Sequence, residues 1–386
     1  MVSYNFSFIS NNLKSLIEPA TQVCHQFYDS LGFSSYENAF IAPYYQWDQS
    51  IGCVIKADGN TIYDSECLEW KENAAFYDLT NAKHQSNRVV FLGFLLTVFG
   101  HSFTDNLRKL WFLKTDICKQ LLKEGVSLVY TTSWNDPLPQ HCLEFIRLAG
   151  IDFSKAQHIT DLTQFDEVII PDNCFRASGL GRMYCQAYTD LIDCIKSNIP
   201  PTYNNEEKIY FTRSSFSVSS MNETGEKALE RVFRKIGYSI IVPERLSIIN
   251  QIQLVMNCRF FAATEGSVAH LSMFCKPGTN LVIINKANYL NFHQVLINEF
   301  ADLNVTYIEA HHSSKTDPIH PWWGPFYLCI TPFLKKYVQS PIPHLPYWLK
   351  FSYWEYKHGF ILRRCYNKFL RIFHNNFAIG GHNAII

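Results

Sequence analysis

The strongest constraint on the fold is the stretch Asn257–Pro277, NCRFFAATEGSVAHLSMFCKP. Its residues 259–264 form an apolar and small-residue run, which is typical of a buried strand. A Glu-Gly-Ser triplet follows at 265–267, and apolar residues at helical spacing follow the triplet. The stretch therefore predicts a strand, a tight glycine turn and a helix whose free N–H groups can hold an anion. An ordinary strand-to-helix turn without a ligand would have the same pattern.

Strand and helix patterns alternate on both sides of this unit. Strands are expected at Lys208–Arg213, Tyr238–Val242 and Leu281–Ile284, with helical segments between them. Such alternation predicts a parallel, doubly wound sheet. Ligands of these sheets bind at the carboxyl ends of the strands, where Arg213 and Glu265 are expected.

At these positions the chain resembles glycosyltransferase family 61. The resemblance rests on IYFTR, MNE, VPERLSIINQI and ATEGSVAHLSMF, and on GHSFTDNLRKLWFL further upstream. It extends roughly from residue 85 to residue 310 and points to the bacterial capsule or surface-polysaccharide type. The family usually has His-Gly-Ala where this chain has Glu265-Gly266-Ser267, and often has a second arginine shortly before the Asn-Glu pair.

The region before residue 200 shows the same alternation. Strands are expected at Val89–Phe94, Ser127–Thr131 and Glu167–Ile170, with helices between them. Two Rossmann-like halves facing a cleft form the GT-B architecture of α/β proteins. We expect domains at 1–200 and 206–330, followed by a basic aromatic helical tail at 335–386.

A transferase cleft must neutralise the leaving diphosphate of a nucleotide-sugar. Arg213 is the first candidate, because a guanidinium group matches two phosphate oxygens. A surface ion pair is its alternative role. Glu265 can accept hydrogen bonds from donor hydroxyls, or it can serve only as a carboxylate at a helix N-terminus. The predicted donor site is completed by Ser214, Glu244, Gly266 and Ser267.

The acceptor hydroxyl also needs a base. A helix is expected over Ser102–Leu113, and His101 and Asp105, four residues apart, would then share one helix face. This spacing suits a base and the group that orients it, with Asp105 the first candidate for the base and His101 the second. A helix-start histidine and a solvated aspartate would explain the same spacing without catalysis.

Composition excludes several classes of function. Lys plus Arg and Asp plus Glu number 34 each, so no bulk charge favours nucleic acid. The 12 cysteines show no metal-binding or paired spacing, which indicates a reduced, cytoplasmic chain. The start of the chain has no leader pattern. No D-x-D motif occurs, so we expect no metal and no cofactor beyond the donor.

The tail differs in character from the rest of the chain. Residues 335–386 contain eight Lys or Arg against one acid, with apolar and basic positions on separate helical faces. This pattern fits a helix lying on an anionic membrane surface. A helix packed across both lobes is the alternative.

Taken together, the sequence predicts an inverting, metal-independent glycosyltransferase of bacterial surface-polysaccharide biosynthesis. Its donor would be a nucleotide-sugar, most simply UDP-linked, and its acceptor a saccharide or lipid-linked saccharide; inversion is implied by the resemblance. The alternatives are a non-catalytic binding scaffold of the same fold and a sugar-phosphate transferase.

Overall fold

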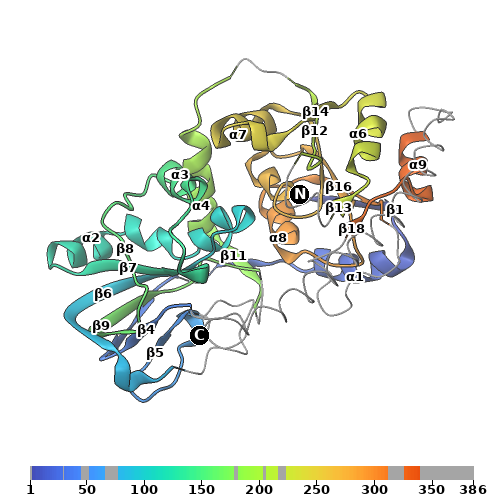
Figure 1. Ribbon diagram of the computed structural model, residues 1–386. Helices are drawn as coiled ribbons and strands as arrows, with labels where there is room; N and C mark the ends of the chain where they lie inside the picture. The colour runs from blue at the N-terminus through green and yellow to red at the C-terminus, as the bar shows by residue number, and fades with distance from the viewer. Residues whose placement is uncertain are drawn as a thin grey trace, which may run out of the picture.

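The computed structural model describes residues 2–28, 30–44, 52–65, 77–177, 181–202, 206–215, 223–311 and 326–339. These residues form two large sheets with helices around them (Figure 1). The first sheet and its surroundings comprise β2 (Gln26–Phe27), β3 (Phe33–Glu37), β4 (Phe40–Ala42), β5 (Cys53–Ile55), β6 (Lys83–Leu95), α2 (Asp116–Lys123), β7 (Ser127–Thr132), α3 (Gln140–Leu148), β8 (Gln157–His158), β9 (Thr163–Pro171), β10 (Phe175–Arg176), β11 (Met183–Cys185) and α4 (Gln186–Ser197).

The second sheet and its surroundings combine the start of the described chain with its later part. They comprise β1 (Ser3–Phe8), α1 (Asn11–Thr21), β12 (Lys208–Phe211), β13 (Glu223–Thr224), α6 (Glu226–Lys235), β14 (Ser239–Ile241), α7 (Ile248–Asn257), β15 (Phe260–Thr264), β16 (Asn280–Asn285), α8 (Phe292–Phe300), β17 (Asn304–Glu309), β18 (Phe326–Tyr327) and α9 (Pro332–Gln339).

The second sheet is parallel throughout, in the order β1-β17-β16-β15-β12-β14. Alternate residues of its strands face opposite layers of helices: Tyr210 packs with α6 and α9, whereas Ile209 and Phe211 belong to the core that contains α1, α7 and α8. The alternation of strands and helices predicted for this region is therefore confirmed.

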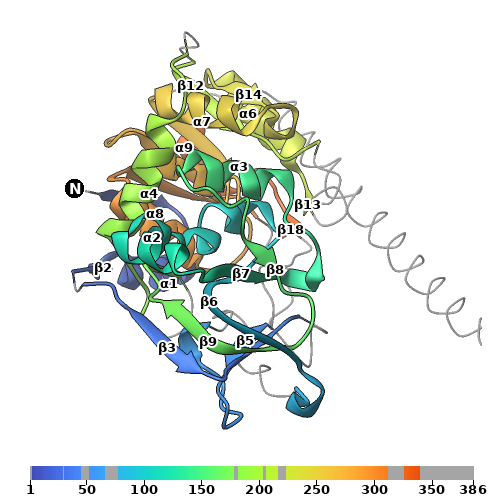
Figure 2. The same ribbon diagram turned by 90° about the vertical axis from the view of Figure 1, so that its left-hand side faces the viewer.

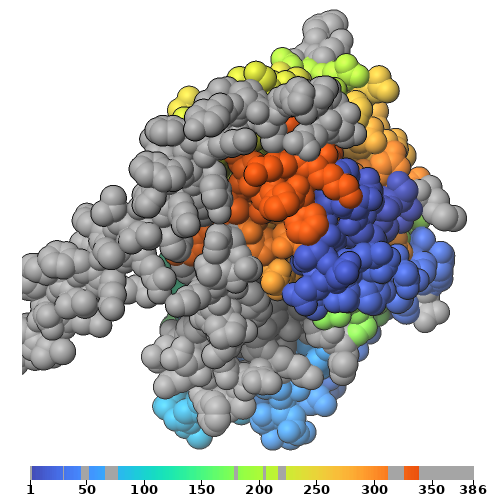
Figure 3. Space-filling model, turned by 90° about the vertical axis from the view of Figure 1, so that its right-hand side faces the viewer, coloured from blue at the N-terminus to red at the C-terminus, as the bar shows by residue number. Residues whose placement is uncertain are grey.

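The N-terminal strand β1 completes this second sheet, although the sequence analysis assigned residues 1–200 to the first domain. It pairs with β17, and Lys336 of α9 donates a hydrogen bond to the Ser7 carbonyl at 3.2 Å. The blue N-terminal surface and the orange-red surface near α9 are accordingly neighbours in Figure 3.

The first sheet is mixed, so the expectation of a doubly wound half holds for only part of it. Strands β9, β6, β7 and β8 run parallel, whereas β3, β4 and β5 pair antiparallel (Figure 2). Strands β3 and β4 lie end to end along β9, and β5 pairs with β4.

One helix predicted from the sequence consists of short 3₁₀ segments instead. The region expected as a helix over Ser102–Leu113 is divided into η4 (Phe99–Ser102), η5 (Asp105–Leu107) and η6 (Leu110–Lys114). Thr104 breaks the helix with φ −104° and ψ −95°, and its hydroxyl donates to the Gly100 carbonyl at 2.9 Å. A side chain that bonds the backbone in this way competes with a regular helix.

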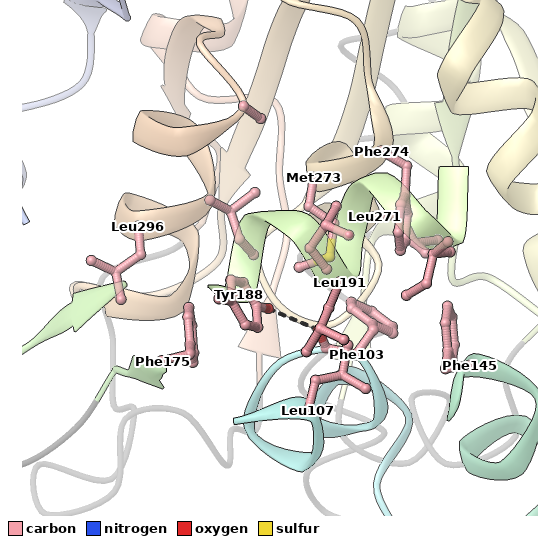
Figure 4. Close-up of a cluster of buried hydrophobic side chains, with 14 of the residues drawn as sticks. Phe103, Leu107, Phe145, Phe175, Tyr188, Leu191, Leu271, Met273, Phe274 and Leu296 are labelled. Carbon is pink, nitrogen blue, oxygen red and sulfur yellow. Dashed lines mark hydrogen bonds between the residues drawn. The ribbon is translucent and has the colours of Figure 1, made fainter. Parts of the chain in front are cut away.

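The two halves share one continuous hydrophobic core. Figure 4 shows Phe103 of the η4–η5 segment, Tyr188 of α4 and Leu271 of η9 (Ala269–Phe274) packed together. All three side chains are fully buried, and the Tyr188 hydroxyl donates to the Phe103 carbonyl at 2.8 Å. The segment that carries His101 and Asp105 is therefore anchored to both halves.

No helix within the described residues is long and apolar enough to cross a bilayer. The tail expected to bind a membrane or to pack on the body lies, from residue 340 onward, outside the described residues.

The anchor predicts a specific loss of stability. Tyr188→Phe removes the hydroxyl that donates to the Phe103 carbonyl and leaves that carbonyl as a buried acceptor without this donor. We therefore expect the free energy of unfolding to fall by about 1–3 kcal/mol. Equilibrium urea denaturation measures it. Tyr28→Phe, at a side chain that is 79% exposed, is the matched control and should change stability very little. Equal effects in both variants would contradict the anchoring role of Tyr188.

Candidate functional site

A group of charged residues lies at the carboxyl edge of the second sheet. Arg213 follows β12, Glu265 follows β15, and Lys286 follows β16. Arg213 and Lys286 converge on one carboxylate: their Nε and Nζ atoms lie 3.4 Å and 2.8 Å from the oxygens of Glu223. The side chains of the two cations are only 16% and 12% exposed. The site therefore brings two positive charges together at the place predicted for the ligand.

Burial controls the ionisation of this group. Burial raises the pKa of Glu226 and of Glu265 to about 7, and it lowers the pKa of Lys286. Glu223 behaves differently: burial opposes its charge, but Lys286 and Arg213 lower its pKa below the usual range. Glu223 is thus the ionised partner of the two cations, while its neighbours Glu226 and Glu265 become largely neutral acids only below neutral pH.

The glycine turn lies beside these cations, but it has no helix that could hold an anion. The segment after it, η9, is a short 3₁₀ helix whose N-cap, Val268, makes no side-chain capping bond. The prediction of a regular helix after the glycine turn is therefore wrong. Gly266 has φ +123°, and a Cβ atom at this residue would be 3.7 Å from Nζ of Lys286.

The other donor residues predicted from the sequence differ in placement. The Glu265 carboxylate accepts a hydrogen bond from the Asn285 side chain at 3.2 Å and is buried. Ser214 lies beside Arg213, and its backbone N–H donates to the Thr212 hydroxyl at 3.2 Å. Glu244 is exposed in η8 (Pro243–Arg245), after the edge strand β14, and no hydrogen bond or ion pair joins it to the cluster within the described residues.

A second cluster surrounds the Asp105 carboxylate. One of its oxygens, Oδ2, lies 2.6 Å from Nδ1 of His101 and 2.8 Å from Nε2 of His293. The Thr104 hydroxyl donates to the same oxygen at 3.0 Å. His101 and Asp105 meet as predicted, although through 3₁₀ turns, and His293 comes from α8 of the other half. His270 of η9 stacks beside His293, with 5.6 Å between ring centroids.

The cluster has the geometry of an oriented base. Although burial opposes ionisation, His293 and His101 hold the pKa of Asp105 well below its usual range. An ionised, buried carboxylate that accepts three hydrogen bonds orients its neighbours and is a weak proton acceptor. With Nδ1 of His101 turned toward Asp105, the opposite edge of the imidazole ring, which carries Nε2, points away from that carboxylate. The His101 side chain is 23% exposed, against 7% for Asp105.

The same three residues could also hold a metal ion, because one ligand atom from each lies within 4.8 Å of the others. At the spacings observed here, the three residues are joined by hydrogen bonds, and a bound ion would need them to move slightly apart. Donor atoms at zinc-bond lengths of about 2.0–2.1 Å are separated by about 3 Å or more. The contacts of Asp105 with His101 and His293, at 2.6 and 2.8 Å, are those of charge-assisted hydrogen bonds.

A close backbone contact joins the two clusters. A Cβ atom at Gly100 would lie 2.5 Å from Oγ and 2.8 Å from Cβ of Ser267. Only glycine therefore allows the segment that carries His101 to approach the turn that follows β15. This contact places the histidine cluster next to the carboxyl edge of the second sheet.

Sequence reasoning missed Lys286, Glu223, His270 and His293. Lys286 follows a predicted parallel strand directly, so the argument that selected Arg213 would have selected it as well. His293 is the second residue of α8 and has no motif around it, and only the folded chain shows that it meets Asp105.

The fold and the two clusters define an α/β protein in which two largely buried cations at a sheet edge lie beside an oriented histidine. Residues 99–282, a little under half of the chain, match the family model described as Glycosyltransferase 61. This match supports glycosyltransferase activity and spans His101, Asp105, Arg213 and Glu265. No curated protein matches the chain in a sequence search.

The contact at Gly100 predicts a rescue. Gly100→Ala places a methyl group on Ser267 and should cost about 1–3 kcal/mol through overpacking. Activity should fall together with stability, because the added methyl group displaces the segment that carries His101. Ser267→Gly removes the obstructing side chain, so the double variant should recover much of the stability and activity. Thermal unfolding and turnover measure both. Additive losses in the double variant would contradict this contact.

Proposed function

We propose that the protein is an inverting glycosyltransferase of GT-B architecture that moves a sugar from a UDP-sugar to a saccharide acceptor. Its role would be in bacterial surface-polysaccharide assembly at the cytoplasmic membrane face. The family match supports the reaction class, and the resemblance of the motifs supports inversion and the polysaccharide role.

The placement of His101 beside the sheet edge supports this proposal most directly. In the proposed reaction, Nε2 of His101 takes the proton of an acceptor hydroxyl. The hydroxyl oxygen attacks the anomeric carbon while the bond from that carbon to the diphosphate breaks on the opposite face. Asp105 holds the ring and stabilises the imidazolium ion that forms. The buried position of Asp105 supports this positioning role and favours His101, the second candidate from the sequence, as the base.

Arg213 and Lys286 would stabilise the diphosphate as it leaves. They supply two positive charges near one ionised carboxylate, Glu223, in a half-buried setting where charge interactions are stronger than in water. The raised pKa of Glu265 reduces the negative charge facing the donor. The two cations thus take over the role of a divalent ion, and we propose a metal-independent transfer.

The donor site predicts weaker nucleotide binding in two variants. Arg213→Ala and Lys286→Ala should each weaken UDP binding by about 1.5–3 kcal/mol, which is typical of hydrogen bonds to charged groups. Isothermal calorimetry on folded variants measures this. Lys208→Ala, at the opposite end of β12, is the control and should bind UDP as the wild type does. If both test variants bind UDP as tightly as the wild type does, the nucleotide-sugar does not bind at this sheet edge.

The base assignment separates the enzyme from a binding scaffold. His101→Ala and Asp105→Asn should lower turnover at least ~100-fold with little change in UDP affinity, because only proton transfer is lost. His25→Ala, which removes a histidine paired with Glu299, is the control. Turnover should also survive a metal chelator. A wild-type protein that binds UDP but neither hydrolyses nor transfers a donor sugar would be a scaffold, and a phosphodiester product would indicate a sugar-phosphate transferase.

A further inference from the structure

The turn after β7 holds an aromatic side chain in an unusual backbone conformation. Trp134 has φ +57° and ψ +15°, and Asn135 has φ +54°, so two consecutive residues other than glycine are left-handed. This conformation is disfavoured for bulky side chains, and it persists only where the surroundings enforce it, often at ligand sites. Yet the Trp134 side chain is 47% exposed.

Hydrogen bonds on both sides of the turn enforce this geometry. The Thr132 hydroxyl donates to the Asp136 carbonyl at 2.6 Å, which closes the turn. The Asn135 amide donates to the Tyr44 carbonyl at 2.6 Å, and the Tyr44 ring lies 5.8 Å from the Trp134 ring, centroid to centroid. The indole is therefore held in a fixed position at the carboxyl end of a parallel strand.

The same turn is bonded to the segment that carries the base. The Ser133 hydroxyl contacts the backbone N–H of Thr97 at 3.1 Å and its hydroxyl at 2.9 Å. Val98 follows, with 45% of its side chain exposed, and its carbonyl accepts the backbone N–H of His101 at 3.0 Å. The turn that carries the exposed indole is thus linked to the His101 segment through the hydrogen bonds of the neighbouring Ser133.

We propose that Trp134 is the platform on which a sugar ring of the acceptor stacks, so that an acceptor hydroxyl reaches His101. The inference rests on the proposed transferase function. An indole offers a large, rigid apolar face with little conformational freedom to lose, which suits the apolar C–H face of a sugar ring. Its place on the half opposite Arg213 and Lys286 assigns it to the acceptor rather than to the donor.

Saturation-transfer NMR with methyl glycosides of common hexoses and pentoses tests the platform without requiring turnover. The wild type should transfer saturation to the ring protons of at least one glycoside. Trp134→Ala should lose this signal, Trp134→Phe should keep part of it, and Tyr28→Ala, at an exposed ring elsewhere, should keep all of it. Absence of a signal in the wild type, or an equal signal in Trp134→Ala, would overturn the proposal.

Stability and donor hydrolysis separate this role from packing and from the donor chemistry. Trp134→Gly relieves the left-handed strain, so it should unfold at the same or a higher temperature than the wild type while losing glycoside binding. A lower unfolding temperature would identify Trp134 as a packing residue. Donor hydrolysis without acceptor should be unchanged in Trp134→Ala. If the wild type hydrolyses no donor, the proposed function fails, whatever the glycoside signal shows.

Discussion

The arrangement of the two halves depends on the contacts of the buried Asp105 carboxylate with His101 and His293. A charge removed from water is costly unless charged or hydrogen-bonding partners surround it. Here those partners come from both halves: His101 lies on the same segment as Asp105, and His293 lies on α8 beside the second sheet. Separating the halves would strip Asp105 of one histidine. The shared core and the close approach at Gly100 therefore serve one requirement, which is to keep both histidines on this carboxylate.

Burial also controls the ionisation of the glutamates at the sheet edge, but only one of the three stays fully ionised near neutral pH. Glu223 stays ionised because two cations contact it, whereas burial outweighs the attraction of Arg213 on Glu226 and of Lys286 on Glu265 and raises the pKa of both acids. Raised carboxyl pKa values of about 7 leave the region with less negative charge than its sequence implies. Below neutral pH, where Glu226 and Glu265 are mostly protonated, the three glutamates and two cations therefore carry a net positive charge.

The sequence was informative where a pattern is local and uninformative where contacts are distant. The alternation of apolar strands with helices predicts the parallel second sheet, because each strand-to-helix unit carries its own signal. The membership of β1 in that sheet carries no such signal, since its partner β17 is hundreds of residues away in sequence. His101 and Asp105 were found through their spacing, even though Thr104 interrupts the expected helix. His293 could not be found, because its role depends entirely on docking of the halves.

This chain has Glu265-Gly266-Ser267 where the family that it resembles has His-Gly-Ala. The chemical difference is smaller than the negative charge of an ionised glutamate suggests. A neutral histidine presents one hydrogen-bond donor and one acceptor, and so does a protonated glutamic acid. Burial raises the pKa of Glu265 to about 7, which makes the neutral acid available near physiological pH. Ser267, in the place of the family's alanine, is accommodated because residue 100 has no side chain. Both differences therefore have a structural account that leaves the oriented His101 intact, and this favours an active transferase over a scaffold that has lost its chemistry.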